Sequence, residues 1–348
     1  MNTGVSVILP TLNEADQVAT ALESLANQTY DEFEVVVVDD GSDDGTIEVV
    51  RQFESAVPDL TIIERDTATG LPSALNTGVT EAKYDLLARQ DADDRSMPPR
   101  LERQVAYLNR NPETALVGSG AYLTDSDGSL RSVRHVRIKP SKDQLLDSSP
   151  FIHGSVMFRR DPFETVGGYS EQFPTAEDLE LWARLAVKYP LRNIDEPLYV
   201  LQMNPDSVYA TEMYRTKLYG KYGVIRTLTD RCPDDFDDKV EADGISAIEE
   251  LLTPEELQTL RVTTAQELLR YGDRATSLSH SGAALRTNPF DSMSWGTVGL
   301  AVAPTALVTK IIECYRTKLN RDIIKENWRT KIEDQAIPSG GEHTFKRQ

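Results

Sequence analysis

The sequence predicts an α/β fold in which helices cover both faces of a mostly parallel sheet. Short apolar runs rich in β-branched residues alternate four times with stretches whose apolar residues recur at helical spacing. Polar loops follow the first, second and fourth apolar runs. Such alternation is typical of parallel strands joined by crossover helices. After residue 202 the pattern changes to helix, so we expect a C-terminal helical extension.

The elements of the first half follow one another closely. Buried strands are expected at 5–9, 33–38, 60–63 and 84–89, and helices at 15–27, 47–53 and 70–82. Val18, Leu22 and Leu25 share one face of the first helix. The turn at 125–128 predicts a hairpin between 121–124 and 129–133. Further along, 151–160 reads as a loop entering a strand, and 178–187 as a helix.

Three polar loops follow the predicted strands, at 10–14, 39–44 and 91–94. Open parallel sheets bind ligands beyond the carboxyl ends of their strands, where these loops fall. The loops therefore predict one binding site at that edge of the sheet.

Composition limits the class of protein. A chain of 348 residues with 39% hydrophobic residues can bury a sizeable core. The net charge of −19 argues against a nucleic-acid binder, because phosphate contacts need clustered Lys and Arg. Many acids with few lysines are typical of proteins from salt-loving microbes.

Two further features concern the cellular compartment. Cys232 and Cys314 lie far apart without a CxxC partner, which favours a reducing cytoplasm. The apolar run at 5–9 is too short for a signal peptide and lacks a basic flank.

The acidic cluster Asp91, Asp93 and Asp94 ends the fourth predicted strand. Three neighbouring carboxylates repel one another unless solvent, a base or a cation offsets their charge. A hard ion such as Mn²⁺ or Mg²⁺ suits these oxygen ligands and keeps positions open for substrate phosphates. The alternative is a solvated acidic turn.

Other nucleotide and metal motifs are excluded by spacing. An EF-hand that began at Asp40 would place Arg51 where the bidentate glutamate is required. Neither a GxGxxG fingerprint after the first strand nor a P-loop is present.

Six motifs in order resemble glycosyltransferase family 2. They are PTLNE at 10–14, VDDGSDDGT at 38–46, LNTG at 75–78, DADD at 91–94, GGY at 167–169 and AEDLELWARL at 176–185. The resemblance covers roughly residues 4–202. It implies the GT-A fold, a Rossmann-like sheet with helices on both faces, and an inverting enzyme that uses a nucleotide sugar.

The resemblance also implies roles for single residues. Asp39 is similar to the acid that receives the base, typically uracil. Asp91 resembles the first acid of the DxD pair, directed towards ribose or metal, and Asp93 the direct ligand of Mn²⁺ or Mg²⁺. Asp94 is either an acid supporting that ligand or a loop cap. The implied nucleotide-sugar contacts are Pro10, Thr11, Asn13, Glu14, Asp39, Asp40, Asn76, Asp91 and Ala92.

Asp178 resembles the base that deprotonates the acceptor hydroxyl. A single displacement needs one base, and a divalent cation can neutralise the leaving diphosphate. Without the resemblance, Glu177 and Asp178 read as acids favoured at a helix N-terminus. The candidates for lining the donor or acceptor pocket are His153, Gly168, Glu177, Trp182 and Arg184.

Each pocket candidate has a structural alternative. His153 can be a structural histidine, Trp182 a core residue and Arg184 a member of a surface ion pair. Gly168 suits a tight turn where a backbone approaches the sugar closely.

We expect a donor half at 1–110, an acceptor half at 111–202, a helical region at 203–335 and a disordered tail at 336–348. Residues 230–256 hold eleven acids against Arg231 and Lys239 and are interpreted as a solvated linker and helix start. Helices follow at 254–271 and 274–286.

The uncharged stretch 294–309 predicts either a buried helical hairpin or a segment lying in a membrane interface. The next stretch, 310–331, carries seven basic residues against three acids. Peripheral contact of 294–331 with the cytoplasmic face of the cell membrane is the hypothesis that follows.

The sequence thus predicts a metal-dependent, inverting transfer of a hexosyl or hexuronosyl group. The donor would be a nucleotide sugar, with UDP favoured by family habit, and the acceptor a saccharide that can be lipid-linked. Cell-surface glycan or glycoprotein assembly, including haloarchaeal protein N-glycosylation, would be the setting. One alternative is a transferase that glycosylates polyprenyl phosphate, and another is a non-catalytic sugar- or nucleotide-binding scaffold.

Overall fold

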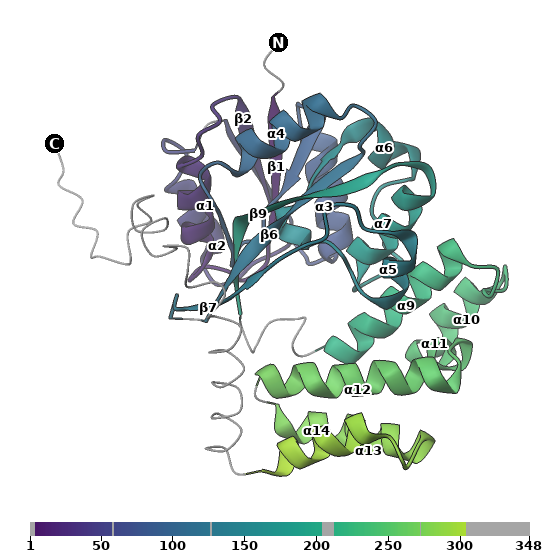
Figure 1. The fold of residues 1–348 in the computed structure, drawn as a ribbon. Helices are drawn as coiled ribbons and strands as arrows, with labels where there is room; N and C mark the ends of the chain where they lie inside the picture. The colour runs from purple at the N-terminus through teal and green to yellow at the C-terminus, as the bar shows by residue number, and fades with distance from the viewer. Residues whose placement is uncertain (1–3, 58, 126, 204–211, 272, 304–348) are drawn as a thin grey trace.

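A computed structural model describes residues 4–57, 59–125, 127–203, 212–271 and 273–303 (Figure 1). One sheet organises the first two thirds of the chain, with the strand order β3-β2-β1-β4-β8-β6-β9-β5 and β7 paired to β6. The four strands predicted at the N-terminal side are confirmed and are parallel: β1 (Val5–Thr11), β2 (Phe33–Asp39), β3 (Leu60–Glu64) and β4 (Leu86–Arg89).

The remaining strands extend the sheet beyond β4 and make it mixed. β8 (Met157–Arg159) is antiparallel to β4 and to β6 (Leu116–Thr124), and β9 (Leu191–Gln202) is parallel to β6. The predicted hairpin is confirmed by the pairing of β6 with β7 (Leu130–Arg134). The short β5 (Arg95–Ser96) pairs with the end of β9.

Two apolar cores lie on opposite faces of this sheet because side chains alternate along each strand. Val7 and Leu9 of β1 pack on one face, and Ile8 packs on the other. The first core includes α1 (Val18–Ala26), α2 (Thr46–Arg51) and α4 (Arg100–Arg110). The second includes α3 (Leu71–Glu81), α5 (Lys142–Asp147), α6 (Arg160–Thr165) and α7 (Glu177–Lys188).

The C-terminal helices lie beside the α7 side of the sheet domain (Figure 1). They are α9 (Met213–Leu228), α10 (Phe236–Asp243), α11 (Ile245–Leu251), α12 (Pro254–Tyr271), α13 (Arg274–Thr287) and α14 (Ser292–Val302). The predicted span of α12 is confirmed, and α13 extends one residue beyond its predicted end.

The interpretation of 230–256 as a solvated linker is wrong. Phe236 and Val240 of α10 and Ala247 and Ile248 of α11 are buried in one cluster with residues of α9. Acids occupy the outward positions of these short helices, so a charge count alone did not reveal their apolar side.

Of the uncharged stretch 294–309, residues 294–302 lie in α14 and 303 follows it. Positions 304–309, the basic stretch 310–331 and the tail 336–348 fall outside the described residues. In the part of the chain that the structure describes, no helix is both long and apolar enough to span a bilayer.

The carboxyl ends of the parallel strands bring the polar loops together. The register places Thr11 beside Asp39, and the amide of Gln90 donates to the carbonyl of Ile8 at 3.0 Å. The 3₁₀ turn His153–Ser155 leads into β8 and reaches the same edge, because β8 pairs with β4.

Candidate active site

The first polar loop is fastened to the second. The amide of Asn13 donates to Ser42 Oγ at 2.8 Å, and Asn13 Oδ1 accepts from the amide of Asp43 at 2.9 Å. The amide of Glu14 donates to Thr46 Oγ1 at 2.8 Å. Asn13 has a φ of 56°, a left-handed conformation that asparagine tolerates better than most residues. These bonds fix the loop that follows β1.

Asp39 and Asp40 are neighbours with different surroundings. Asp39 is buried and accepts hydrogen bonds from the amide and hydroxyl of Ser42. Asp40 accepts from the amides of Thr69 (3.0 Å) and Gly70 (2.8 Å) and from Arg65 Nη1 (2.9 Å). Burial acts to raise the pKa of Asp40, but these donors outweigh it and hold that pKa below its usual value. Asp40 thus serves to hold the 65–70 segment, and its oxygens are committed to protein donors.

Carboxylates converge between the first loop and the end of β4. Burial and the charges of Asp93 and Asp91 raise the pKa of Glu14 to about 7. Burial and Asp91 raise the pKa of Asp93 to about 6. Burial, Asp91 and Asp93 likewise raise the pKa of Asp94, whose Oδ1 accepts from the amide of Gln202 at 2.8 Å. Asp94 therefore ties the acidic loop to the end of β9.

Arg89 is the counter-charge within this cluster. It is 3% exposed, and its Nη1 pairs with Asp91 Oδ2. The sequence indicated this counter-charge, because Arg89 ends the apolar run 84–89 two residues before the first acid of the cluster. One guanidinium leaves the cluster of Glu14, Asp91, Asp93 and Asp94 with an excess of negative charge, in accord with the raised pKa values.

A buried polar network that sequence reasoning missed supports the same loop. The hydroxyl of Tyr199 on β9 accepts from the amide of Asp91 at 3.1 Å and from Gln90 Nε2 at 3.3 Å. Gln90 Nε2 also donates to the carbonyls of Asp91 and Asp94. Arg100 Nη1 donates hydrogen bonds to the carbonyls of Arg89 (2.9 Å) and Gly154 (2.7 Å).

Gly154 has a steric reason to be glycine. A Cβ atom there would lie 2.4 Å from Asp91 Oδ2 and 2.2 Å from the Tyr199 hydroxyl. The 153–155 turn can therefore close against the acidic loop only without a side chain at this position.

Glu177 and Asp178 begin α7 at the same edge, where Glu177 is buried and Asp178 is half-buried. Burial raises the pKa of Asp178, while the amide of Leu179 and the charge of Arg89 partly oppose it. The charge of Asp91 also acts on the pKa of Asp178. Glu177, the neighbour of Asp178, also contacts His153 at 3.4 Å in the turn that lies against Asp91.

A chain of neutral groups lies beside Asp178. His153 Nδ1 is 3.4 Å from Glu177 Oε1, and His153 Nε2 is 2.9 Å from the Tyr169 hydroxyl. Burial, with the charge of Asp178, raises the pKa of Glu177 to about 8. Burial, with the charge of Arg89, lowers the pKa of His153 well below its usual value. At neutral pH the contact is therefore mainly between a protonated carboxyl and a neutral imidazole.

The other pocket candidates have structural partners. Asn76 Nδ2 and Oδ1 bond to the carbonyl and amide of Tyr169 at 2.9 and 3.0 Å, which fixes the turn that contains Gly168. Gly168 has a φ of 69°. Trp182 is 0% exposed in the second core, the structural alternative considered for it.

Arg184 forms an ion pair, which was its structural alternative, but its partner Glu180 on α7 is 1% exposed, so the pair is partly buried and not on the surface. The Arg184 guanidinium is half-buried and bonds to Glu180 and to the carbonyls of Val166 and Gly168. Pro10, Thr11 and Ala92 are buried at the loop bases.

The donor set fits a divalent cation shared with a substrate. Among the residues described, no three His, Cys, Asp or Glu side chains form a cage that could hold a metal alone. Mg²⁺-type ions, however, are commonly bound by one or two carboxylates together with substrate phosphates. The excess negative charge around Asp93 suits such an ion.

A parallel four-strand half joined to a mixed half, with acidic loops at the carboxyl edge, defines a GT-A-like glycosyltransferase fold. Two solved structures share it at identities that show the fold alone. TarS residues 1–349 of S. aureus, in complex with UDP-GlcNAc, matches with TM-score 0.54 and 16% identity over 86% of this chain and 90% of that one. The mannosyltransferase PcManGT of Pyrobaculum calidifontis, in complex with GDP-Man and Mn²⁺, matches with TM-score 0.53 and 20% identity over 94% and 88%.

The chain belongs to glycosyltransferase family 2. The model of that family, "Glycosyl transferase family 2", matches residues 6–167. The putative glycosyltransferase EpsE of Bacillus subtilis is 35% identical over 60% of this chain and 76% of its own length. Glycosyltransferase AglE of the haloarchaeon Haloferax volcanii is 31% identical over 52% of this chain and 60% of its own length. The predicted family, fold class and enzymatic activity are therefore confirmed.

Proposed function

We propose that this transferase inverts the anomeric centre of a nucleotide sugar, preferably a UDP-sugar, and moves the sugar to a saccharide acceptor in cell-surface glycan or glycoprotein assembly. Relatives named for amylovoran and O-antigen biosynthesis support such a setting. The solved neighbours contain UDP-GlcNAc in one case and GDP-Man with Mn²⁺ in the other, which supports a nucleotide-sugar donor and a divalent cation.

One observation carries the proposal. The start of α7, which carries Asp178, and the acidic loop both contact the 153–155 turn: His153 Nδ1 is 3.4 Å from Glu177 Oε1, and Gly154 lies against Asp91 Oδ2. A base that activates an acceptor must lie near the anomeric carbon, which is bonded to the diphosphate. Proximity of the two acids is what a direct displacement requires.

Each role in sugar transfer is assigned to residues at this edge of the sheet. Asp93, aided by Asp91, would hold a divalent cation, which supplies charge neutralisation for the departing diphosphate. The 11–14 loop and Asp39 face the nucleoside. Asp178 accepts the proton of the acceptor hydroxyl as the new bond forms on the opposite face of the sugar. Its raised pKa makes it a better proton acceptor than an ordinary aspartate once it is ionised.

A paired substitution tests this division. Asp178→Asn should lower sugar transfer by about 10²–10⁴-fold because the base is lost. Donor binding, measured calorimetrically with UDP-sugars and GDP-mannose in the presence of Mn²⁺, should remain. Asp93→Asn should weaken that metal-dependent binding itself. Asp161→Asn, an exposed acid on α6, is the matched control. Full transfer by Asp178→Asn would refute the assignment.

A further inference from the structure

Helix α14 exposes several large apolar side chains and buries small polar ones. Its buried positions are Ser294 (0% exposed), Thr297 (2%) and Ala301 (7%). Its outward positions include Met293 (54% exposed), Trp295 (56%) and Val302 (65%), and Phe290 just before it is 93% exposed. Water-facing helices normally show the opposite arrangement, with apolar residues inward and charged residues outward. The four exposed side chains, Phe290, Met293, Trp295 and Val302, are called the apolar ridge below.

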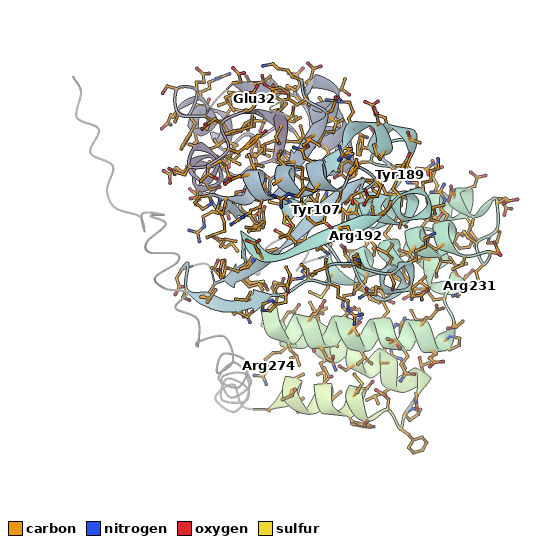
Figure 2. The ribbon with its side chains drawn as sticks, turned by 45° about the horizontal axis from the view of Figure 1, so that its top comes forward. Glu32, Tyr107, Tyr189, Arg192, Arg231 and Arg274 are labelled. Atoms are coloured by element: carbon orange, nitrogen blue, oxygen red, sulfur yellow. The ribbon has the colours of Figure 1, made fainter. Side chains whose placement is uncertain are left out.

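The ridge is held in place at both ends of α14. The side chain of Asp291 accepts from the amide of Ser294 at 2.6 Å and caps the N-terminus. Arg274, labelled on α13 in Figure 2, donates to the terminal carbonyls of Leu300 (3.3 Å) and Ala301 (2.8 Å). Trp295 Nε1 donates to the carbonyl of Pro289 at 2.8 Å, which satisfies its only polar atom. The apolar side chains therefore project from an anchored helix.

The outward surface is also free of charge. Residues 292–302 contain no ionisable side chain, and a Cβ at Gly296 or Gly299 would meet no atom within 4 Å. The sequence that follows, 310–331, has seven basic residues and three acids in a chain whose net charge is −19. An apolar surface followed by an isolated basic stretch is complementary to an anionic lipid bilayer, where Trp and Phe favour the interface.

We propose that the apolar ridge enters the interface of an anionic bilayer. The proposal concerns only α13, α14 and the chain beyond them, so it stands independently of the donor and acceptor proposed above. It would bring the enzyme to the surface in which lipid-linked acceptors are held.

Vesicle sedimentation of the full chain tests the ridge. We expect binding to vesicles that contain phosphatidylglycerol, and weaker binding to pure phosphatidylcholine. The triple substitution Phe290→Ser, Met293→Ser and Trp295→Ser should lower the partition coefficient by about tenfold or more, because the buried apolar area is lost. Val187→Ser and Ile138→Ser, which alter exposed apolar residues elsewhere, should bind as the unaltered chain does. Reversing Lys310, Arg316 and Lys318 to Glu should remove the preference for the anionic lipid.

Tryptophan quenching locates the contact. In a Trp328→Phe variant, the two remaining tryptophans are the buried Trp182 and the exposed Trp295. Brominated lipids should quench the Trp295 emission and leave the Trp182 emission as an internal reference. Equal vesicle binding by the triple variant, or absence of quenching, overturns the proposal.

Two controls distinguish bilayer binding from self-association and from a defect at the donor site. A molar mass that doubles without vesicles, and returns to the monomer value in the triple variant, would assign the ridge to a second copy and overturn the proposal. Hydrolysis of the nucleotide sugar without vesicles should be the same in the triple variant. A failure of donor turnover in the unaltered chain would therefore count against the proposed function and leave the membrane proposal standing.

Discussion

At the scale of single residues, burial and hydrogen bonding at the active-site edge change the protonation states of ordinary side chains. Glu177 and His153 are 3.4 Å apart, a distance typical of an ion pair, yet burial favours the neutral form of each. Asp40, in contrast, stays ionised because backbone amides and Arg65 surround it. Similar carboxyl groups therefore have different charges because different donors reach them.

The raised pKa of Glu177 predicts a pH dependence of stability. The folded chain keeps this proton up to about pH 8, whereas an unfolded chain releases it near 4.5. The folded state binds the extra proton between these values, so the free energy of unfolding should fall as pH rises through this window. Glu177→Gln cannot release a proton and should lose less stability between pH 6 and pH 9. Thermal unfolding measures this, with the exposed Glu171→Gln as control. Identical pH slopes for Glu177→Gln and the unaltered chain would contradict the prediction.

At the scale of elements, distant strands set the shape of the acidic loop. The loop follows β4, but its amide at Asp91 is fixed by Tyr199 of β9, and Asp94 is fixed by the amide of Gln202. Arg100 of α4 ties the end of β4 to the 153–155 turn. The proposed metal ligands are thus positioned by elements outside the acidic loop itself.

Removal of the Tyr199 hydroxyl should test this support. Tyr199→Phe leaves the buried ring in place but removes the acceptor for Asp91 and Gln90. We expect the KM for the nucleotide sugar and the half-saturating Mn²⁺ concentration to rise by about threefold to tenfold, because the amide of Asp91 and the side chain of Gln90 lose their acceptor. The kcat should change less, because Asp178 is untouched. Tyr107→Phe on α4, labelled in Figure 2, is the matched control. A fall in kcat alone would argue against a positioning role.

At the scale of the whole molecule, the charge of −19 acts on stability as well as on association. Like charges destabilise a compact state through mutual repulsion, and salt shortens the range of that repulsion. The acids of α10 and α11 concentrate this charge on the C-terminal helices.

We therefore expect the melting temperature to rise as KCl is increased from 0.1 M to about 2 M. Most of the rise should occur below about 1 M, where the Debye length shortens most. Thermal unfolding monitored by circular dichroism measures the rise. Sucrose at matched osmolality is the control, since it strengthens burial without screening charge. An equal rise in sucrose would exclude charge repulsion as the cause.

The sequence by itself determined the four parallel strands, the helices between them and the polar loops that follow them. β-branched runs such as 33–38 can be read from a few contiguous residues, because side-chain alternation is local. The motifs around Asp39, Asp93 and Asp178 indicated the family because each one is a short contiguous stretch of the sequence.

Only the tertiary structure decided which polar groups meet. The bond between Asp91 and Tyr199 joins residues 108 positions apart. The many acids of 230–256 predicted a solvated linker, whereas this stretch forms helices that pack on α9. The tertiary structure also showed that the side chains of Asp40 and Asn76 bond to neighbouring segments of the protein, and that Met293, Trp295 and Val302 of α14 are exposed. The physical reason is that burial and pairing depend on which surfaces come together, and local sequence patterns do not carry that information.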